Sequence, residues 1–463
     1  EDCLNTIELP RHIVTIKKVL FIFLTALIVR IGYAWFFIEA EYLILEDQKM
    51  YIQLGKVMAE TSNFLLDPSG YYAVVTDRLH GYPTLLAVVY TLFGENNLAV
   101  VMIQIFIDSL TCVIIGLIAE SIITRGFIVA GIVSALNLNM IILSGMILTD
   151  TLFLFIFSLF ILLVISYIKH PTNLKLFTVI SVLSLSALVR PVSYYLIFLI
   201  LPLLIGFFVW KGVSFKRVMY SLLLYIIPIV IVFGSIHHRN YHEYNSFSLV
   251  SQGGGHVLGW IVPATYQYSG QGSYQEGQVL AKGSLENAMH RDEFKMSPNN
   301  PFKNSAYKMQ VAKEVLTELG LLNMLHAWSA GVVINLLTPS IAHAPIVRAI
   351  EHPSFYATSG DGMVEKFLNY VTNTDSLLYL SIITIGTIVE LVFIIASTFG
   401  LYRMIQSLWY EGYNRETLLF LLFVIVYFIA ITGPIVGVKY RLPIEPILTV
   451  FFSYALLRYR KKS

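Results

Sequence analysis

Long apolar runs constrain this chain more than any other feature of its sequence. A helix that spans a membrane needs about 20 predominantly apolar residues. Eight runs are close to that length: 19–38, 98–122, 126–147, 151–168, 218–236, 376–400, 417–433 and 442–457. Two shorter runs between 176 and 210 are interrupted at Arg190-Pro191, and proline disfavours helix at the residue before it. We interpret them as two further spans with a tight turn between them.

The composition agrees with a membrane protein. Hydrophobic residues make up 56% of the chain and charged residues 13%, against roughly a quarter in soluble proteins. The net charge of +2 and the lack of basic runs outside the last few residues predict no nucleic-acid partner. Cys3 and Cys112 are the two cysteines, so no disulfide framework is expected. We therefore predict an all-α polytopic membrane protein with about ten transmembrane helices.

Basic residues in short loops predict the topology, because they stay on the cytoplasmic side. The apolar segments 81–94 and 321–337 are ambiguous. If neither crosses, the cations of the short loops, such as Arg125, Lys211 and Arg403, all fall inside together with both termini. The stretches 39–97, 237–375 and 433–441 then face outward.

This topology divides the chain into three parts. The first, 1–236, is a transmembrane module with the first outer loop at 39–97. The second, 237–375, is a large outer loop region with an expected helix at 304–319 and a membrane-associated helix at 321–337. The third, 376–463, holds the last transmembrane helices. We also expect outer-face helices beside the membrane, including one at 48–60.

Acidic residues follow two of the predicted spans at the outer boundary. Glu46-Asp47 comes after the first span, one helical turn before Tyr51, and Asp150 opens the span at 151–168. A carboxylate in such a place can accept a proton from an incoming hydroxyl or amine. The alternative interpretation is a solvated acidic loop at a helix N-terminus for the pair, and a helix cap for Asp150.

Arginines on the outer side break the inward preference of basic residues. They are Arg30, Arg78, Arg190, Arg239 and Arg441. Arginine binds phosphate bidentately, so the set indicates an anionic lipid headgroup. Each arginine taken alone could instead extend its side chain to the headgroup level, and we favour this for Arg30.

Histidines and glycines of the large loop region carry less information. The spacing of His237, His238, His242 and His256 fits no zinc signature, so we assign no metal ligand. Gly253-Gly254-Gly255 could approach a phosphate, but without a strand-to-helix context we interpret it as a plain loop.

Several motifs together resemble the GT-C glycosyltransferases. They occur in this order: Glu46-Asp47-x-x-x-Tyr51, Arg78-x-x-Gly81-Tyr82-Pro83, Leu148-Thr149-Asp150, Leu188-Val189-Arg190-Pro191, Arg239-Asn240-Tyr241 and Tyr440-Arg441-Leu442-Pro443. The bacterial branch that they resemble includes protein O-mannosyltransferases and lipid A aminoarabinose transferases. The resemblance covers 19–255 and 376–457.

This resemblance implies an inverting glycosyltransferase. Such an enzyme moves a hexosyl or pentosyl group from a polyprenyl-phosphate carrier to an acceptor at the outer face of the membrane, here the bacterial plasma (inner) membrane. It implies Asp47, Asp150 and Glu46 as catalytic candidates, with Asp47 favoured as the base. The implied substrate-binding residues are Tyr51, Arg78, Tyr82, Arg190, Arg239, Tyr440 and Arg441.

Several questions stay open at this stage. The acceptor could be a glycolipid, a cell-wall glycan or a protein, and a divalent cation as cofactor is left open. A transporter, flippase or ligase for lipid-linked glycans would also need outward arginines and buried acids. A noncatalytic scaffold of the same family is a third alternative.

Overall fold

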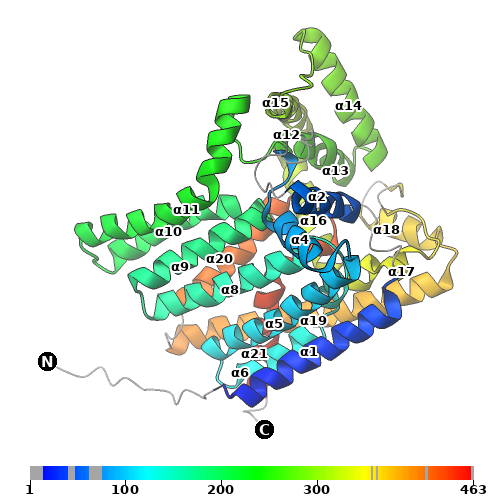
Figure 1. Ribbon diagram of the computed structural model, residues 1–463. Helices are drawn as coiled ribbons and strands as arrows, with labels where there is room; N and C mark the ends of the chain where they lie inside the picture. The colour runs from blue at the N-terminus through cyan, green and yellow to red at the C-terminus, as the bar shows by residue number, and fades with distance from the viewer. Residues whose placement is uncertain are drawn as a thin grey trace.

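The computed structural model describes residues 14–39, 47–61, 76–355, 358–360, 363–411 and 415–459. Within these ranges the chain forms helices and no strand. Glu46 lies outside the described residues. The helices form one bundle, with α14 and α15 projecting from it (Figure 1). The predicted all-α fold is confirmed.

Among the described residues, seven helices are individually long and apolar enough to cross a membrane. They are α1 (Ile16–Phe37), α5 (Asn97–Ile122), α8 (Asp150–Lys169), α10 (Val192–Trp210), α11 (Phe215–Tyr244), α19 (Leu377–Glu411) and α20 (Arg415–Thr432). Each coincides with a predicted span. In the most apolar 18-residue stretch of α5, 61% of the stretch is buried inside the protein. The corresponding share is only 17% in α1 and in α19. Helix α5 therefore lies at the centre of the bundle, and α1 and α19 lie at its periphery.

The other three predicted spans are less regular. The run 126–147 forms two helices, α6 (Gly126–Ala135) and α7 (Leu138–Ser144), which are bent by 54°. Asn137 causes the break, because its side chain caps α7 by accepting from the N–H of Met140 at 3.0 Å. Helix α9 (Asn173–Val189) and helix α21 (Glu445–Tyr459) are the shorter helices of the other two runs.

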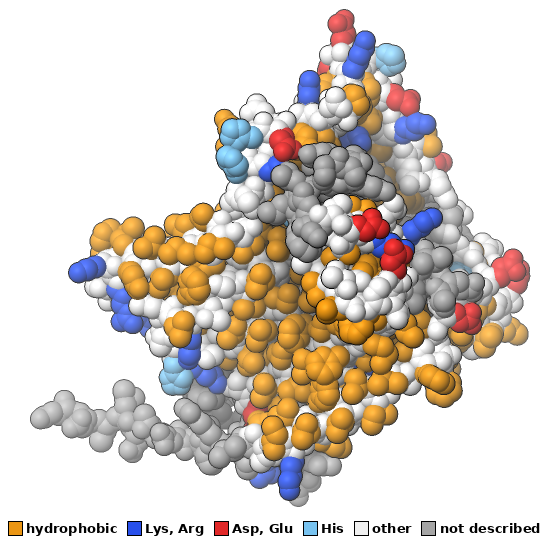
Figure 2. Space-filling view, viewed as in Figure 1, with side chains coloured by type: hydrophobic (Ala, Val, Ile, Leu, Met, Phe, Trp, Pro, Cys, Tyr) orange, Lys and Arg blue, Asp and Glu red, His pale blue; other side chains and the backbone are white. Residues whose placement is uncertain are grey.

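Apolar side chains cover the bundle on the face shown in Figure 2, and charged side chains gather on α14 and α15 and at the ends of the long helices. The exposed apolar residues include Trp35, Phe198, Ile231 and Ile395, which come from four of the candidate spans. A water-soluble monomer rarely exposes such a wide apolar surface. The protein is therefore an integral membrane protein.

Shorter helices lie beside the bundle. Helix α2 (Asp47–Thr61) follows α1, and α4 (Gly81–Phe93) packs against α2. The 13 residues of α4 make a helix of about 20 Å, too short for a hydrocarbon core of about 30 Å. Helix α16 (Leu321–Leu337) makes an angle of 100° with α15 (Pro301–Leu319). The length of α4 agrees with the expectation that 81–94 does not cross, and the expectation that 321–337 does not cross stays a prediction.

The region after α11 forms a small helical unit with its own hydrophobic core. It comprises α12 (Gly253–His256), η2 (Val257–Ile261), α13 (Val262–Tyr268), α14 (Tyr274–Arg291) and α15. A capping box at Ser273 begins α14. A Cβ on Gly254 would lie 1.8 Å from the Ser305 carbonyl oxygen. This glycine is therefore required for the contact between α12 and α15, and Gly253-Gly254-Gly255 is a short helix rather than a plain loop.

Short helical segments complete the chain between and after the long helices. They are η3 (Ser340–His343), α17 (Pro345–Arg348), α18 (Met363–Thr372), η4 (Val438–Tyr440) and η5 (Leu442–Ile444).

The sidedness of the bundle gives a first prediction. A cysteine that replaces the exposed Glu95 should react with a membrane-impermeant thiol reagent added to intact cells, because 39–97 is expected outside. The matched control is a cysteine in place of Ser214, between α10 and α11, which should react only after the membrane is opened. The reverse pattern would invert the topology.

Candidate functional site

Asp150 and Arg190 form an ion pair at one end of the bundle. Asp150 is the first residue of α8, and Arg190 is the C-cap of α9. The Arg190 Nη1 donates to Asp150 Oδ1 at 2.6 Å, and the guanidinium lies 5.4 Å from the centroid of the Phe153 ring. The Asp150 side chain is 4% exposed and that of Arg190 is 19% exposed. The carboxylate is thus used to orient the arginine, and it does not cap α8.

Two glutamines hold the link that leads from α7 to Asp150. The Gln104 amide on α5 donates to the carbonyls of Ser144 and Met146, at 3.2 and 2.8 Å. The Ile147 N–H donates to the side-chain oxygen of Gln48 on α2 at 2.7 Å. Gln104 and Gln48 are both buried, so these bonds are shielded from water. They connect the start of α8 to α5 and to α2.

Tyr51 lies among the predicted acids and arginines. Burial raises the pKa of its phenol, Arg78 and Arg190 lower the pKa, and Asp47 and Asp150 raise it. Four charged groups predicted for the site are therefore close enough to Tyr51 to act on its ionisation. This convergence is the central observation about the site.

Tyr82 supports Tyr51 from α4. The two rings make an edge-to-face contact with centroids 5.2 Å apart. The Tyr82 hydroxyl donates to Gln104 Oε1 at 2.6 Å, and its side chain is fully buried. In this structure Tyr82 therefore positions Tyr51 from within the bundle.

Asp47 begins α2 and faces a cation from the last part of the chain. Its side chain is 52% exposed, and Oδ2 lies 3.8 Å from the Nζ of Lys439. The Lys439 Nζ also lies 5.8 Å from the centroid of the Tyr440 ring. An exposed carboxylate in this position can accept a proton from an incoming nucleophile.

Arg78 is held by its neighbours and keeps most of its own donors open. Ser251, just before α12, donates its N–H to the Thr76 carbonyl at 2.8 Å, and its hydroxyl donates to the carboxylate of Asp77. Within the described ranges the Arg78 guanidinium makes one hydrogen bond, of 3.3 Å, to the Asp77 carbonyl. It can therefore bind an additional anion.

Arg239 lies at the edge of this group. It donates to the side-chain oxygen of its neighbour Asn240, and it acts on His80, two residues from Arg78. Burial and, to a smaller extent, the positive charge of Arg239 lower the pKa of His80 to about 4. This imidazole is therefore neutral at pH 7.

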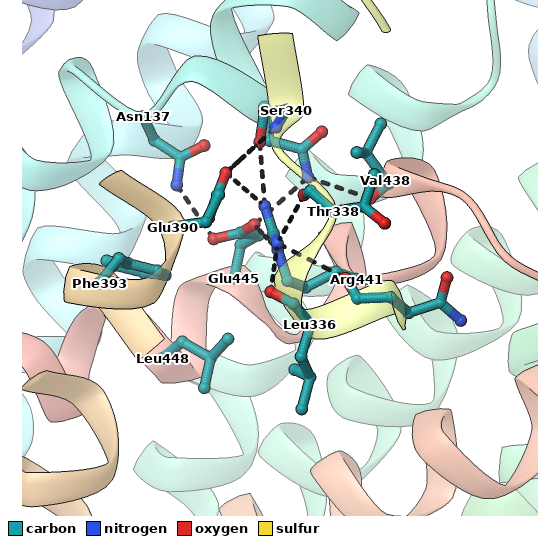
Figure 3. Close-up of polar contacts among 12 residues, drawn as sticks. Asn137, Leu336, Thr338, Ser340, Glu390, Phe393, Val438, Arg441, Glu445 and Leu448 are labelled. Atoms are coloured by element: carbon teal, nitrogen blue, oxygen red, sulfur yellow. Dashed lines mark hydrogen bonds and ion pairs between the residues drawn. The ribbon is translucent and has the colours of Figure 1, made fainter. Parts of the chain in front are cut away.

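Arg441 takes a different place from the one expected for a phosphate ligand. Its side chain is 1% exposed, and it pairs with Glu390 on α19 and with Glu445 on α21, at 2.7 Å in each case (Figure 3). It also donates to the Leu336 carbonyl at 2.8 Å and to the Ser340 hydroxyl at 2.9 Å. The guanidinium is thus engaged inside the protein and connects four segments of the chain.

The carboxylates of this network are bonded in turn. Glu445 accepts from the side-chain amides of Asn137 and Asn139, at 3.0 and 3.3 Å. Glu390 accepts from the Ser340 hydroxyl at 2.5 Å. The network fixes the segment around η4, which carries Lys439 and Tyr440.

The four histidines of the loop region lie in three different environments. His237 contacts the Tyr194 hydroxyl at 2.9 Å, and the rings of His238 and His242 lie 4.5 Å apart. His256 lies near Arg78 and Lys439, which together with burial lower the pKa of its imidazole. In the part of the chain that the structure describes, no three His, Cys, Asp or Glu side chains are placed to hold one metal ion.

Sequence reasoning missed Lys439 and His256 as members of the site. The segment 433–441 is expected on the outer side, and the argument from outward cations that singled out Arg441 applies equally to Lys439. His256 carried no separate signal, because its proximity to Arg78 depends on the packing of α12.

Gly81 gives a second prediction, because it sets the distance between α4 and α9. A Cβ on Gly81 would lie 2.8 Å from the carbonyl carbon and oxygen of Leu188. Gly81→Ala should therefore cost about 1–3 kcal/mol of stability through overpacking beside Arg190. The control is Gly32→Ala in α1, where nothing lies within 4 Å of the new methyl group. Thermal unfolding in detergent measures both, and equal melting temperatures would contradict the prediction.

Comparison with known proteins finds likeness in structure alone. No protein-family profile and no curated sequence matches the chain. The oligosaccharyltransferase AglB of Archaeoglobus fulgidus, solved with an inhibitory peptide and a dolichol-phosphate, superposes with a TM-score of 0.54 at 13% identity. The match covers 96% of this chain and 50% of AglB, so the chain spans about half the length of that protein.

A second solved structure is ArnT of Cupriavidus metallidurans bound to undecaprenyl phosphate. Its TM-score is 0.35 at 12% identity, over 96% of this chain and 77% of ArnT. Both proteins are glycosyltransferases of the GT-C class. Nearly the whole length of this chain shares its fold with AglB. The chain therefore has the helical membrane fold of the GT-C glycosyltransferases.

Proposed function

We propose that this protein is a glycosyltransferase that uses a polyprenyl-phosphate-linked sugar as donor. The observation that carries the proposal is the Asp150–Arg190 ion pair of 2.6 Å and the Asp47 carboxylate 3.8 Å from Lys439. Both acids act on the ionisation of Tyr51, which lies between α1 and α4 in the chain. An exposed carboxylate and partly exposed arginines are what this reaction requires. The fold shared with AglB, which was solved with a dolichol-phosphate, supports the proposal.

In the proposed reaction, a hydroxyl or amine of the acceptor attacks the anomeric carbon of the donor sugar. The new glycosidic bond forms on the face opposite the phosphate, so the configuration inverts. Asp47 takes the proton of the nucleophile as the bond forms. The bond from the anomeric carbon to the phosphate oxygen breaks, and the carrier phosphate leaves as an anion that needs no proton.

The cations of the site would stabilise the leaving phosphate. Arg78 has open donors, and within the described residues Arg190 uses only Nη1, for Asp150. Lys439 adds a third positive charge beside Asp47. Fixed positive charge that meets a developing anion lowers the barrier to its departure. Arg441 would act indirectly as a positioning residue for Lys439, because its own donors are used inside the protein.

The remaining assignments belong to the same proposal. Asp150 orients Arg190, and Tyr82 supports Tyr51. Tyr440 and Arg239 border the site. The reaction takes place at the outer face of a bacterial plasma membrane.

The test of the function is a third prediction. Purified protein in nanodiscs receives a radiolabelled polyprenyl-phosphate hexose or pentose and an extract of bacterial envelope lipids and glycans. We expect free polyprenyl phosphate and labelled acceptor to appear in equal amounts. Arg78→Gln should raise the apparent KM for the donor about tenfold or more, since it removes a charged hydrogen-bond partner of the phosphate.

Lys282→Gln on α14 is the matched control, because this exposed lysine lies in the projecting helix. It should leave the KM for the donor unchanged. If intact donor crosses the bilayer of a vesicle without loss of its sugar, the protein is a flippase and the proposal fails.

A further inference from the structure

Lys366 on α18 has a buried ammonium group. Its side chain is 2% exposed, and within the described ranges Nζ has no hydrogen-bond partner. No carboxylate among the described residues forms an ion pair with it. Nζ lies 4.7 Å from the centroid of the Phe355 ring and 5.6 Å from that of Tyr268. Aromatic faces attract a cation, but they compensate only part of its lost hydration.

Burial lowers the pKa of the Lys366 ammonium to about 8. Most of the lysine is therefore still charged at pH 7. A charged group in such a place reduces stability unless an anion joins it. Native proteins keep unsatisfied buried polar groups mainly where the groups have a function.

A second unpartnered donor lies beside the ammonium. Tyr268 on α13 is 6% exposed, and its hydroxyl has no hydrogen-bond partner in the part of the chain that the structure describes. An ammonium and a phenol from two different helices can both donate to one oxyanion. A phosphate or a carboxylate fits this pair of donors, and an apolar group does not.

A buried cluster connects this pair with the segment that faces Asp47. It contains Tyr268, Tyr274 and Val436, and Val436 lies three residues before Lys439. The Lys439 ammonium in turn lies 3.8 Å from the Asp47 carboxylate. The pair of donors is therefore joined by packing to the segment beside the proposed base.

We propose that Lys366 and Tyr268 bind a phosphate or carboxylate group of the acceptor, whose nucleophile lies at Asp47. This inference rests on the proposed function, and it adds that the acceptor is an acidic glycan or glycolipid. Arg78, Arg190 and Lys439 serve the phosphate of the donor, so a second anionic group needs a separate cation. Lys366 supplies it.

Removing the charge of Lys366 distinguishes a role in anion binding from a role in supporting the fold. Lys366→Met keeps the length of the side chain and removes the unpaired charge, so the protein should melt at a higher temperature than the wild type. A residue that only supports the fold would show the opposite change. Lys366→Arg keeps the charge and should retain acceptor binding.

Transfer to fractionated acceptors is the functional readout. The envelope extract is separated by anion exchange into a neutral and an acidic fraction, and each is offered with labelled donor. We expect label in the acidic fraction, and an apparent KM for that fraction about tenfold higher or more in Lys366→Met. The KM for the donor should not change, and the control Lys282→Met should match the wild type. Label in the neutral fraction alone, or an unchanged KM, would overturn the inference.

A binding experiment distinguishes this failure from failure of the proposed function. Lysines of the full chain are labelled with ¹³C-methyl groups, and the NMR signal absent from Lys366→Arg is assigned to Lys366. Inorganic phosphate or acetate should shift this signal saturably and raise its pKa, since a nearby anion favours the charged form. If neither fraction accepts sugar but an anion shifts the signal, the anion site stands and the transferase fails. If neither anion shifts the signal, the site itself is refuted.

Discussion

Replacing Asp47 by Asn should lower the turnover of the purified protein by about 10²–10⁴-fold, the usual loss when a general base is removed. The carboxylate is half exposed, faces Lys439 at 3.8 Å and lies close enough to Tyr51 to affect its pKa. Asparagine has nearly the same size and cannot accept the proton. Turnover at saturating donor and acceptor, measured together with the melting temperature, checks this expectation.

Glu46→Gln is the matched control, since it removes the same charge one residue earlier. A severe loss for Asp47→Asn beside a mild loss for Glu46→Gln assigns the base to Asp47. The reverse pattern assigns it to Glu46. Normal turnover in both variants would leave the proposed transferase without a base and would contradict the mechanism.

Arg441→Ala should destabilise the protein by about 3–5 kcal/mol, because it leaves Glu390 and Glu445 buried without their cation. The same change should lower turnover, since the segment that carries Lys439 loses the contacts that fix it. Thermal unfolding measures the first effect, and sugar transfer measures the second. Arg403→Ala, which removes an arginine from α19 outside this network, should change the melting temperature little.

The cause of this loss can be tested by removing the whole network. Arg441→Leu combined with Glu390→Gln and Glu445→Gln eliminates all three charges, and it should recover most of the stability lost by Arg441→Ala. If Arg441 instead held the donor phosphate directly, the triple variant would be stable and its KM for the donor would rise strongly. A rise in KM that exceeds the loss in turnover would therefore contradict the positioning role.

The fold class could be predicted from the sequence because a spanning helix is a continuous apolar run along the chain. Each of the seven long apolar helices coincides with a predicted span, and Pro191 separates α9 from α10 as expected. The expected helices at 48–60 and 304–319 appear as α2 and α15. The bend between α6 and α7 was not predicted, because the run 126–147 is apolar throughout and a single capping asparagine decides where it breaks.

The candidate acids and arginines were visible in the sequence, but their pairings were not. Asp47, Asp150, Arg78 and Arg190 all act on the ionisation of Tyr51, and their roles in a reaction stay predictions. The isolated lysine on α18 gave no signal, because the sequence does not show that α13 and the Phe355 segment enclose it.

The sequence by itself thus determined a membrane bundle, because about 20 apolar residues in a row leave a chain few alternatives to a spanning helix. The tertiary structure alone decided how the charges are used. Asp150 pairs with Arg190 across 40 positions, Asp47 faces Lys439 from the other end of the chain, and Arg441 is enclosed by two glutamates. Ion pairs depend on distance and burial, which are set by helix packing between remote segments.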